Sequence, residues 1–167
     1  VLTVGCGSVG SECARRYKAL GCRVLGVDLY PTENELYEKI YPLSVLPSVL
    51  SVSDAVILTL PLTDETRGLF DGEMLSHMKN TAVLINISRG AVVDEDAITA
   101  ALSEKKLYGA VLDVFESEPL SQDSPLWDME NVVITPHNSF VSEKNSERLF
   151  SVIYGNLSGF LKGDKAE

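Results

Sequence analysis

The sequence predicts an α/β fold with a doubly wound, mostly parallel β-sheet. Short apolar or β-branched segments alternate along the chain with segments of helical periodicity, which favours right-handed βαβ crossovers. The strand-like segments are continuous apolar runs, as expected when both faces of a sheet are covered. The chain has 167 residues, so we expect a single domain over 1–167.

The first half of the chain shows this alternation clearly. Residues 1–5 form a short apolar run that ends in glycine. Residues 8–20 carry small or apolar side chains at helical spacing, and Gly21 ends the predicted helix. Further strands are predicted at 23–28 and 55–60.

The second half repeats the pattern. An amphipathic helix is predicted over 94–107, with acidic residues at its start and two lysines near its end, as the helix dipole favours. A longer helix is predicted over 142–161, interrupted by Gly155 and Gly159. The remaining predicted strands cover 82–87, 109–115 and 131–136.

Composition narrows the range of partners. The chain carries 24 acidic and 14 basic residues, a formal net charge of −10. This charge disfavours nucleic acid and anionic membranes, because both repel a negative protein. Cys6, Cys13 and Cys22 are odd in number and lie in one short stretch. We therefore expect reduced thiols in a cytoplasmic protein, and no metal site.

Candidate functional residues follow the predicted strands. A doubly wound sheet binds its ligand outside the carboxyl ends of the strands, near the point where the strand order reverses. The residues at those ends are therefore the ones most relevant to chemistry. They are Gly5 to Gly10, Asp28, Pro61, Ser88 to Gly90, Asp113 to Glu118, and Pro136 with His137.

The first of these segments has the spacing of a dinucleotide-binding turn. Gly5, Gly7 and Gly10 form G-x-G-x-x-G between a predicted strand and a predicted helix, the context that makes this motif specific. The helix start, which includes Ser8 and Val9, offers free N–H groups and a partial positive charge to a pyrophosphate. The motif predicts a Rossmann-type cofactor site; the alternative is a plain glycine turn.

Asp28 ends the second predicted strand. A carboxylate there can accept hydrogen bonds from an adenosine ribose and would repel a 2′-phosphate. Residues 29–33 contain no arginine or lysine to hold such a phosphate. The sequence therefore predicts NAD rather than NADP. The alternative is a solvent-facing acid before a proline turn.

Five motifs together resemble one known family. "GCGSVG", "LPLTDETRGLF", "INISRGAVVDEDAITAAL", "GAVLDVFESEP" and "ITPH" occur in this order, and they resemble the D-isomer-specific 2-hydroxyacid dehydrogenases. The resemblance covers essentially the whole chain but only the NAD-binding domain of that family. It implies hydride transfer between NAD(H) and a small D-2-hydroxy or 2-oxo acid, in a homodimer. The chain begins directly on a strand, which suggests a domain of a two-domain protein whose substrate domain is absent here.

The resemblance also implies catalytic roles. Arg89 would hold the carboxylate and carbonyl of a 2-oxo acid with two donors; a surface arginine at a strand end is the alternative. His137 would accept the hydroxyl proton during oxidation and return it during reduction. Glu118 would hold the imidazole and favour its protonated form. Glu116, two residues earlier, is the rival for that contact.

Further positions match the cofactor groove of the family. Asp113 would bond the nicotinamide carboxamide, or else be a strand-end acid facing water. Pro61 and Thr66 would line the groove, with ordinary turn residues as the alternative. Ser88 and Arg89 lie at the same groove by the same resemblance.

Other features leave the function open. Phe140 is large where the family usually has a small, glycine-containing turn, so we expect an unusual loop over 138–142. His77 lies in a polar stretch and is expected to be solvated. Two non-enzymatic alternatives are an NAD-dependent corepressor-like module and a ligand-sensing Rossmann domain. Because a corepressor can carry the same Arg89, Glu118 and His137, turnover by the full-length protein is what separates these functions.

Overall fold

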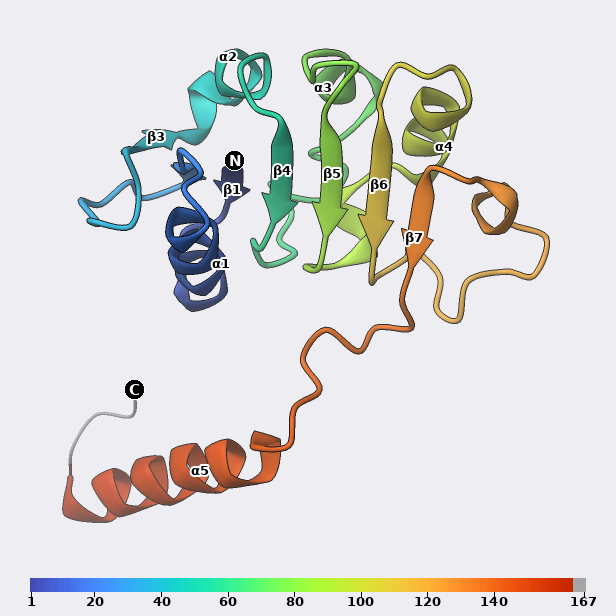
Figure 1. Ribbon diagram of the computed structural model, residues 1–167. Helices are drawn as coiled ribbons and strands as arrows, with labels where there is room; N and C mark the ends of the chain where they lie inside the picture. The colour runs from blue at the N-terminus through green and yellow to red at the C-terminus, as the bar shows by residue number, and fades with distance from the viewer. Residues whose placement is uncertain (164–167) are drawn as a thin grey trace. The chain divides into compact units, whose positions relative to one another are not determined.

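The structure is a computed structural model that describes residues 1–163 (Figure 1). The chain divides into two compact units, Val1–His137 and Asn138–Glu167. The first unit contains the whole β-sheet, and the second contains one long helix. That residues 1–167 form one NAD-binding domain stays a prediction.

All strands of the sheet are parallel, in the order β3-β2-β1-β4-β5-β6-β7. This confirms the doubly wound α/β prediction, and the sheet is wholly rather than mostly parallel. β1 pairs with β2 on one side and with β4 on the other, so the strand order reverses there. The strands are β1 Leu2–Val4, β2 Leu25–Asp28, β3 Lys39–Pro42, β4 Ala55–Leu58, β5 Val83–Asn86, β6 Gly109–Leu112 and β7 Val132–Ile134.

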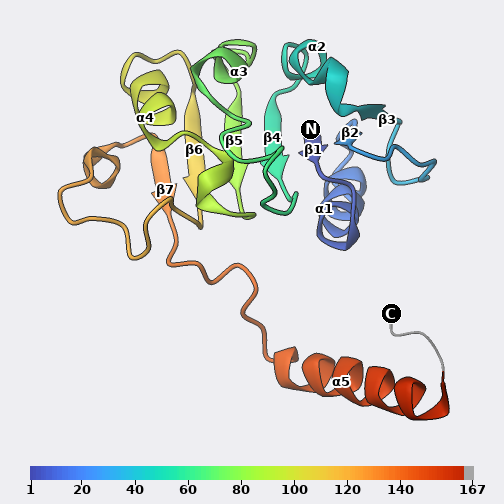
Figure 2. The ribbon, with the colours of Figure 1, turned by 180° about the vertical axis from the view of Figure 1, so that it is seen from behind.

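Helices connect the strands across both faces of the sheet. Right-handed crossovers place α1 on one face and the connections through α2, α3 and α4 on the other. α1 stands in front of the sheet in Figure 1, and Figure 2 shows the opposite face. The helices are α1 Ser8–Ala19, α2 Leu46–Leu50, α3 Gly72–Ser76 and α4 Glu95–Ser103; short 3₁₀ turns cover Leu43–Val45, Gly90–Val92 and Pro125–Asp128.

The structure differs from the predicted elements in length and number. β3, α2 and α3 were not predicted; each has only four or five residues, too few to show a period. α4 ends at Ser103 rather than at residue 107, because the chain turns through Lys105, whose φ is +55°. Leu107 lies beyond that turn and is buried. Its apolar side chain fits the helical spacing, which is why the predicted helix extended to it.

The second unit contains α5, Asn145–Lys162, which ends at Gly163 in a left-handed conformation. The predicted interruption is wrong, since α5 runs through Gly155 and Gly159. Each glycine costs a helix only about 1 kcal/mol relative to alanine. Large apolar side chains recur at helical spacing along α5 and are exposed: Leu149, Phe150, Ile153, Tyr154, Leu157, Phe160 and Leu161.

Buried polar side chains identify the functional edge of the sheet. Among the described residues, the buried polar or charged ones are Thr3, Ser53, Asn86, Ser88 and Asp113. The last three follow or end β5 and β6 at their carboxyl ends. Because buried polar groups need hydrogen-bond partners, this clustering points to a constructed site rather than to ordinary core.

The described residues contain no helix that is both long and apolar enough to cross a membrane.

Candidate active site

The glycine turn after β1 is shaped partly by the chain itself. Gly5 has φ +94°, and a Cβ there would lie 2.8 Å from the Leu60 nitrogen. A Cβ on Gly10 would lie 2.1 Å from the Gly5 carbonyl oxygen. Gly7 is different, because a Cβ there would meet nothing within 4 Å. The fold does not require Gly7, so the open space beside it fits close approach by a ligand.

The N-terminus of α1 opens directly onto this turn. Gly7 is the N-cap, no side chain caps the helix, and its first turn has no acidic residue. Ser8 and Val9 are exposed there. Uncapped N–H groups and the positive end of the helix dipole suit a phosphate anion. The residues present therefore fit the pyrophosphate of a dinucleotide.

Asp28 is held against the same turn. Its Oδ2 accepts a hydrogen bond from the Cys6 N–H at 2.7 Å, and its Oδ1 accepts one from the Tyr30 N–H at 3.0 Å. A carboxylate oxygen can accept a second bond, so both oxygens keep capacity for ribose hydroxyls. Asp28 is half-buried and oriented by two backbone donors, unlike a solvated acid.

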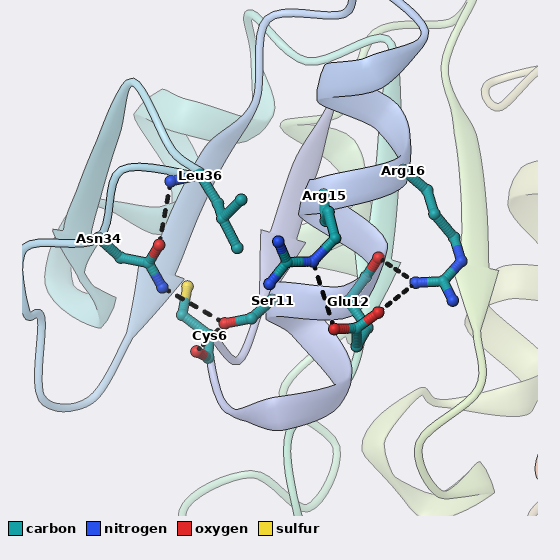
Figure 3. Close-up of polar contacts among 7 residues, drawn as sticks. All are labelled: Cys6, Ser11, Glu12, Arg15, Arg16, Asn34 and Leu36. Carbon is teal, nitrogen blue, oxygen red and sulfur yellow. Dashed lines mark hydrogen bonds and ion pairs between the residues drawn. The ribbon is translucent and has the colours of Figure 1, made fainter.

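The loop after β2 is tied to the start of α1, as Figure 3 shows. Asn34 Nδ2 donates to Ser11 Oγ at 3.4 Å, and Asn34 Oδ1 accepts from the Leu36 N–H at 3.0 Å. The Ser11 hydroxyl in turn donates to the Cys6 carbonyl at 3.1 Å. Burial raises the pKa of the Cys6 thiol. These contacts fix the Asp28 side of the turn.

The turn after β4 is closed by Thr66. Its hydroxyl donates to the Pro61 carbonyl at 2.7 Å and accepts from the Thr63 N–H at 2.8 Å. Thr59 joins this strand end to the glycine turn by donating to the Gly5 carbonyl at 2.7 Å. That Pro61 and Thr66 line a cofactor groove stays a prediction, since the hydrogen bonds of Thr66 lie within the turn.

Asn86 organises the end of β5, and the sequence analysis missed it. Its Oδ1 accepts from the Ser88 N–H at 3.0 Å and the Ser88 hydroxyl at 2.8 Å. Its Nδ2 donates to the Arg89 carbonyl at 3.1 Å. The exposed Arg89 side chain donates to the Ser88 carbonyl at 2.7 Å. An amide ending an otherwise apolar strand was the available signal.

The end of β6 is buried and packed against this turn. Asp113 is 1% exposed, so the alternative of a water-facing acid is wrong. The Thr135 hydroxyl donates to Asp113 Oδ1 at 2.5 Å. A Cβ on Gly90 would lie 1.9 Å from the Phe115 carbonyl oxygen. Glycine at position 90 thus allows the Arg89 turn to contact the loop that carries Glu118.

Glu118, not Glu116, is the carboxylate that contacts His137. Glu118 Oε2 lies 2.7 Å from His137 Nδ1, and Glu118 Oε1 accepts from the Phe115 N–H at 3.1 Å. Partial burial acts to raise the pKa of Glu118, but the bonds from His137 and Phe115 outweigh it and leave that pKa below its usual value. The Glu116 N–H instead donates to Glu95.

His137 adopts a backbone conformation that is rare for its residue type. Its φ is +51°, and its N–H donates to the Thr135 carbonyl at 3.1 Å. Such conformations cost about 1–3 kcal/mol and cluster at functional sites. The other histidine, His77, is exposed at the end of α3, as expected.

A cavity of about 590 Å³ adjoins the Glu118–His137 pair. Its remaining walls are mostly apolar. They are Phe115, Pro119, Leu120, Trp127, Ile134, Thr135 and Pro136. Among the described residues, no group of three or more His, Cys, Asp or Glu could hold a metal ion.

The family model for the NAD-binding domain of D-isomer-specific 2-hydroxyacid dehydrogenases matches residues 1–139. The chain belongs to this family. The match ends close to the boundary between the two units at His137 and Asn138. The resemblance inferred from the motifs is confirmed.

The curated relatives of this chain carry the names of enzymes. It is 42% identical to glyoxylate reductase of Korarchaeum cryptofilum, over 96% of this chain and 48% of that protein. It is 39% identical to (S)-sulfolactate dehydrogenase of Chromohalobacter salexigens, over 92% and 50%. The chain thus spans about half the length of these relatives.

A solved structure also matches this chain. The D-isomer-specific 2-hydroxyacid dehydrogenase of Xanthobacter autotrophicus Py2, crystallised with NADPH and MES, has a TM-score of 0.93 and 38% identity. The match covers 99% of this chain and 68% of that one. The comparisons therefore support NAD(P) as the cofactor, without choosing between NAD and NADP.

The glycine turn of this dehydrogenase domain yields a matched pair of variants. Gly7→Ala should fold with an unchanged melting temperature but bind NADH at least about tenfold more weakly, because its methyl group enters only ligand space. Gly10→Ala should itself lower the melting temperature, since its Cβ collides with the Gly5 carbonyl. Thermal unfolding and NADH fluorescence titration measure the two effects. An equal loss of stability in both variants would contradict this assignment of space.

The lowered pKa of Glu118 predicts a pH-dependent contribution to stability. A carboxyl with a depressed folded-state pKa stabilises the fold above its unfolded value, about 4.3, and loses that contribution as pH falls through the folded pKa. Glu118→Gln should therefore lower the melting temperature at pH 6, and the difference from wild type should vanish toward pH 3. Glu116→Gln is the matched control and should show no such difference at either pH.

Proposed function

We propose that this chain is the NAD-binding part of an enzyme that interconverts a small D-2-hydroxy acid and its 2-oxo acid. The single observation that carries the proposal is the 2.7 Å contact between Glu118 and His137, on the same sheet edge as Arg89. A histidine fixed by a carboxylate is suited to proton transfer. The relatives' names are those of enzymes, which favours turnover over a binding module.

In the proposed mechanism, bound NAD(H) supplies hydride chemistry at the carboxyl edge of the sheet. Arg89 binds the carboxylate of the acid and polarises its carbonyl with the planar fork of its guanidinium. His137 presents Nε2 to the substrate oxygen, because Nδ1 is held by Glu118. It donates a proton to that oxygen during reduction and accepts one during oxidation. Glu118 stabilises the protonated imidazole between these steps.

The cofactor would be held along the strand ends in the proposed function. The glycine turn and Ser8–Val9 take the pyrophosphate, Asp28 takes the adenosine ribose, and Asp113 and Ser88 lie toward the nicotinamide end. Pro61 and Thr66 would border the cofactor between the two ends.

We also propose that the whole protein is a cytoplasmic homodimer whose substrate-binding part lies outside this chain. The relatives are about twice as long as the matched region, which supports a second domain. Sedimentation of the full-length protein at micromolar concentration tests the dimer.

Within NAD(P), we propose a preference for NAD(H). The Asp28 carboxylate is fixed by two backbone donors, so it cannot easily move away from a 2′-phosphate. Residues 29–33 include Glu33 and no base. The relative from Xanthobacter was crystallised with NADPH, so the preference needs a direct measurement.

The preference should be measurable as a ratio of dissociation constants. NADH should bind at least about tenfold more tightly than NADPH, because a like-charge contact with this half-buried carboxylate costs about 1.4 kcal/mol or more. Asp28→Ala should bring the two constants together, mainly by improving NADPH binding. Calorimetry with both cofactors gives the ratio, and equal or tighter binding of NADPH to wild type would contradict the proposal.

Turnover by the full-length protein tests the function itself. A panel of small 2-oxo acids with NADH should reveal at least one substrate. His137→Ala should lower kcat by about 10²–10⁴-fold, the usual contribution of general acid–base catalysis, while NADH binding changes little. His77→Ala is the matched control and should leave kcat unchanged. The chain 1–167 alone should bind NADH without comparable turnover, because orientation of the acid needs both walls of a cleft.

A further inference from the structure

Asn86 stands apart from the other buried polar side chains of the first unit. It is 1% exposed and ends β5, a strand whose remaining side chains are apolar. Its backbone carbonyl accepts from the Asp113 N–H at 3.0 Å and so continues the pairing of β5 with β6. Its side chain bonds instead to the turn that follows the strand.

The contacts of the Asn86 amide all go to two residues. The oxygen accepts from both the N–H and the hydroxyl of Ser88, and the nitrogen donates to the Arg89 carbonyl. The guanidinium of Arg89 then donates to the Ser88 carbonyl at 2.7 Å. One buried amide thus holds a backbone group before the Arg89 Cα, the Ser88 N–H, and one after it, the Arg89 carbonyl.

The other side of the turn is fixed by packing. Gly90 lies so close to the Phe115 backbone that a Cβ would be 1.9 Å from its carbonyl oxygen. With packing on that side and hydrogen bonds on the other, the turn has little freedom to rotate. Loss of the amide would release one of these two restraints while the packing remains.

We propose that Asn86 is the positioning residue for Arg89: its amide sets the direction of the guanidinium and hence where the carboxylate of the acid is held. Asn86 does not touch the substrate in this proposal. The inference rests on the proposed function, because it gives Arg89 a ligand. It predicts that damage at Asn86 appears mainly in the use of the acid and much less in cofactor binding.

The first test uses Asn86→Ala in the full-length protein with NADH and a 2-oxo acid. We expect kcat/KM for the acid to fall about tenfold or more, since the two Ser88 donors and the Arg89 carbonyl acceptor lose their partner. The dissociation constant of NADH should stay within about twofold of wild type. Asn131→Ala is the matched control: the Asn131 amide donates to the Leu102 carbonyl at the opposite edge of the sheet, and kcat/KM should not change.

The second test asks whether Asn86 acts through Arg89, by a double-mutant cycle with Arg89→Lys. If the two act as one unit, Asn86→Ala should reduce kcat/KM by less than about threefold in the Arg89→Lys background. Losses that multiply in full would overturn the proposal, even if Arg89→Lys alone is damaging. If Arg89→Lys leaves kcat/KM for the acid unchanged, the proposed function and this inference both fail.

A third variant keeps the proposal testable if alanine unfolds the protein. The side chain in Asn86→Asp has the shape of the amide, and when protonated it offers one donor and one acceptor as the amide does. When ionised, it has only acceptors and faces the Arg89 carbonyl. Burial beside the Arg89 carbonyl disfavours the charged form and raises the pKa of such a carboxyl above its usual value of about 3.9, so the ratio of its kcat/KM to that of wild type should be below one and should fall as pH rises from 5 to 9. A ratio near one across that range would overturn the proposal.

Discussion

The parallel direction of all the strands is the constraint on which the rest of this molecule depends. Because each strand starts at one edge and ends at the other, residues from distant parts of the chain reach the same edge without specific attraction between them. Gly7, Asp28, Arg89 and His137 all follow or end strands. Neighbouring β5, β6 and β7 then bring Arg89, Glu118 and His137 onto adjacent loops.

Close backbone contacts convert this proximity into fixed geometry. The close approach of Gly10 to the Gly5 carbonyl lets α1 pack onto the end of β1. The close approach of Gly90 to the Phe115 backbone brings two loops of the site into contact. A side chain at either glycine would separate these segments. Hydrogen bonds complete the arrangement, since Glu118 is held by a backbone N–H as well as by His137. Positions of this kind allow little adjustment, because protein interiors are close-packed.

The charge distribution reconciles an acidic protein with anionic ligands. The net charge is −10, which repels anions at long range, although screening limits this effect to about 8–10 Å in salt. At the proposed ligand edge, the start of α1 and Arg89 have the opposite sign, although the carboxylates of Asp28, Asp113 and Glu118 lie at the same edge. The start of α1 has no acid in its first turn, and the Arg89 guanidinium is exposed. Short-range dipoles and one cation can therefore outweigh the global charge.

The sequence by itself determined the fold class, the glycine turn, Asp28 and the family, because these depend on periodicity and on motifs with fixed local spacing. It also selected Glu118 over Glu116 through the motif that the family resemblance supplied. It did not reveal Asn86 or Thr135 as parts of the site, nor the packing of Gly90 against Phe115, since these depend on partners in turns and neighbouring strands. Short elements such as β3 were missed because four residues are too few to show a periodic pattern. Leu107 was assigned to a helix because an apolar loop residue happened to fit the helical spacing. Only the tertiary structure decided which polar groups are buried and bonded, as burial is a property of the packed chain and not of the residues that compose it.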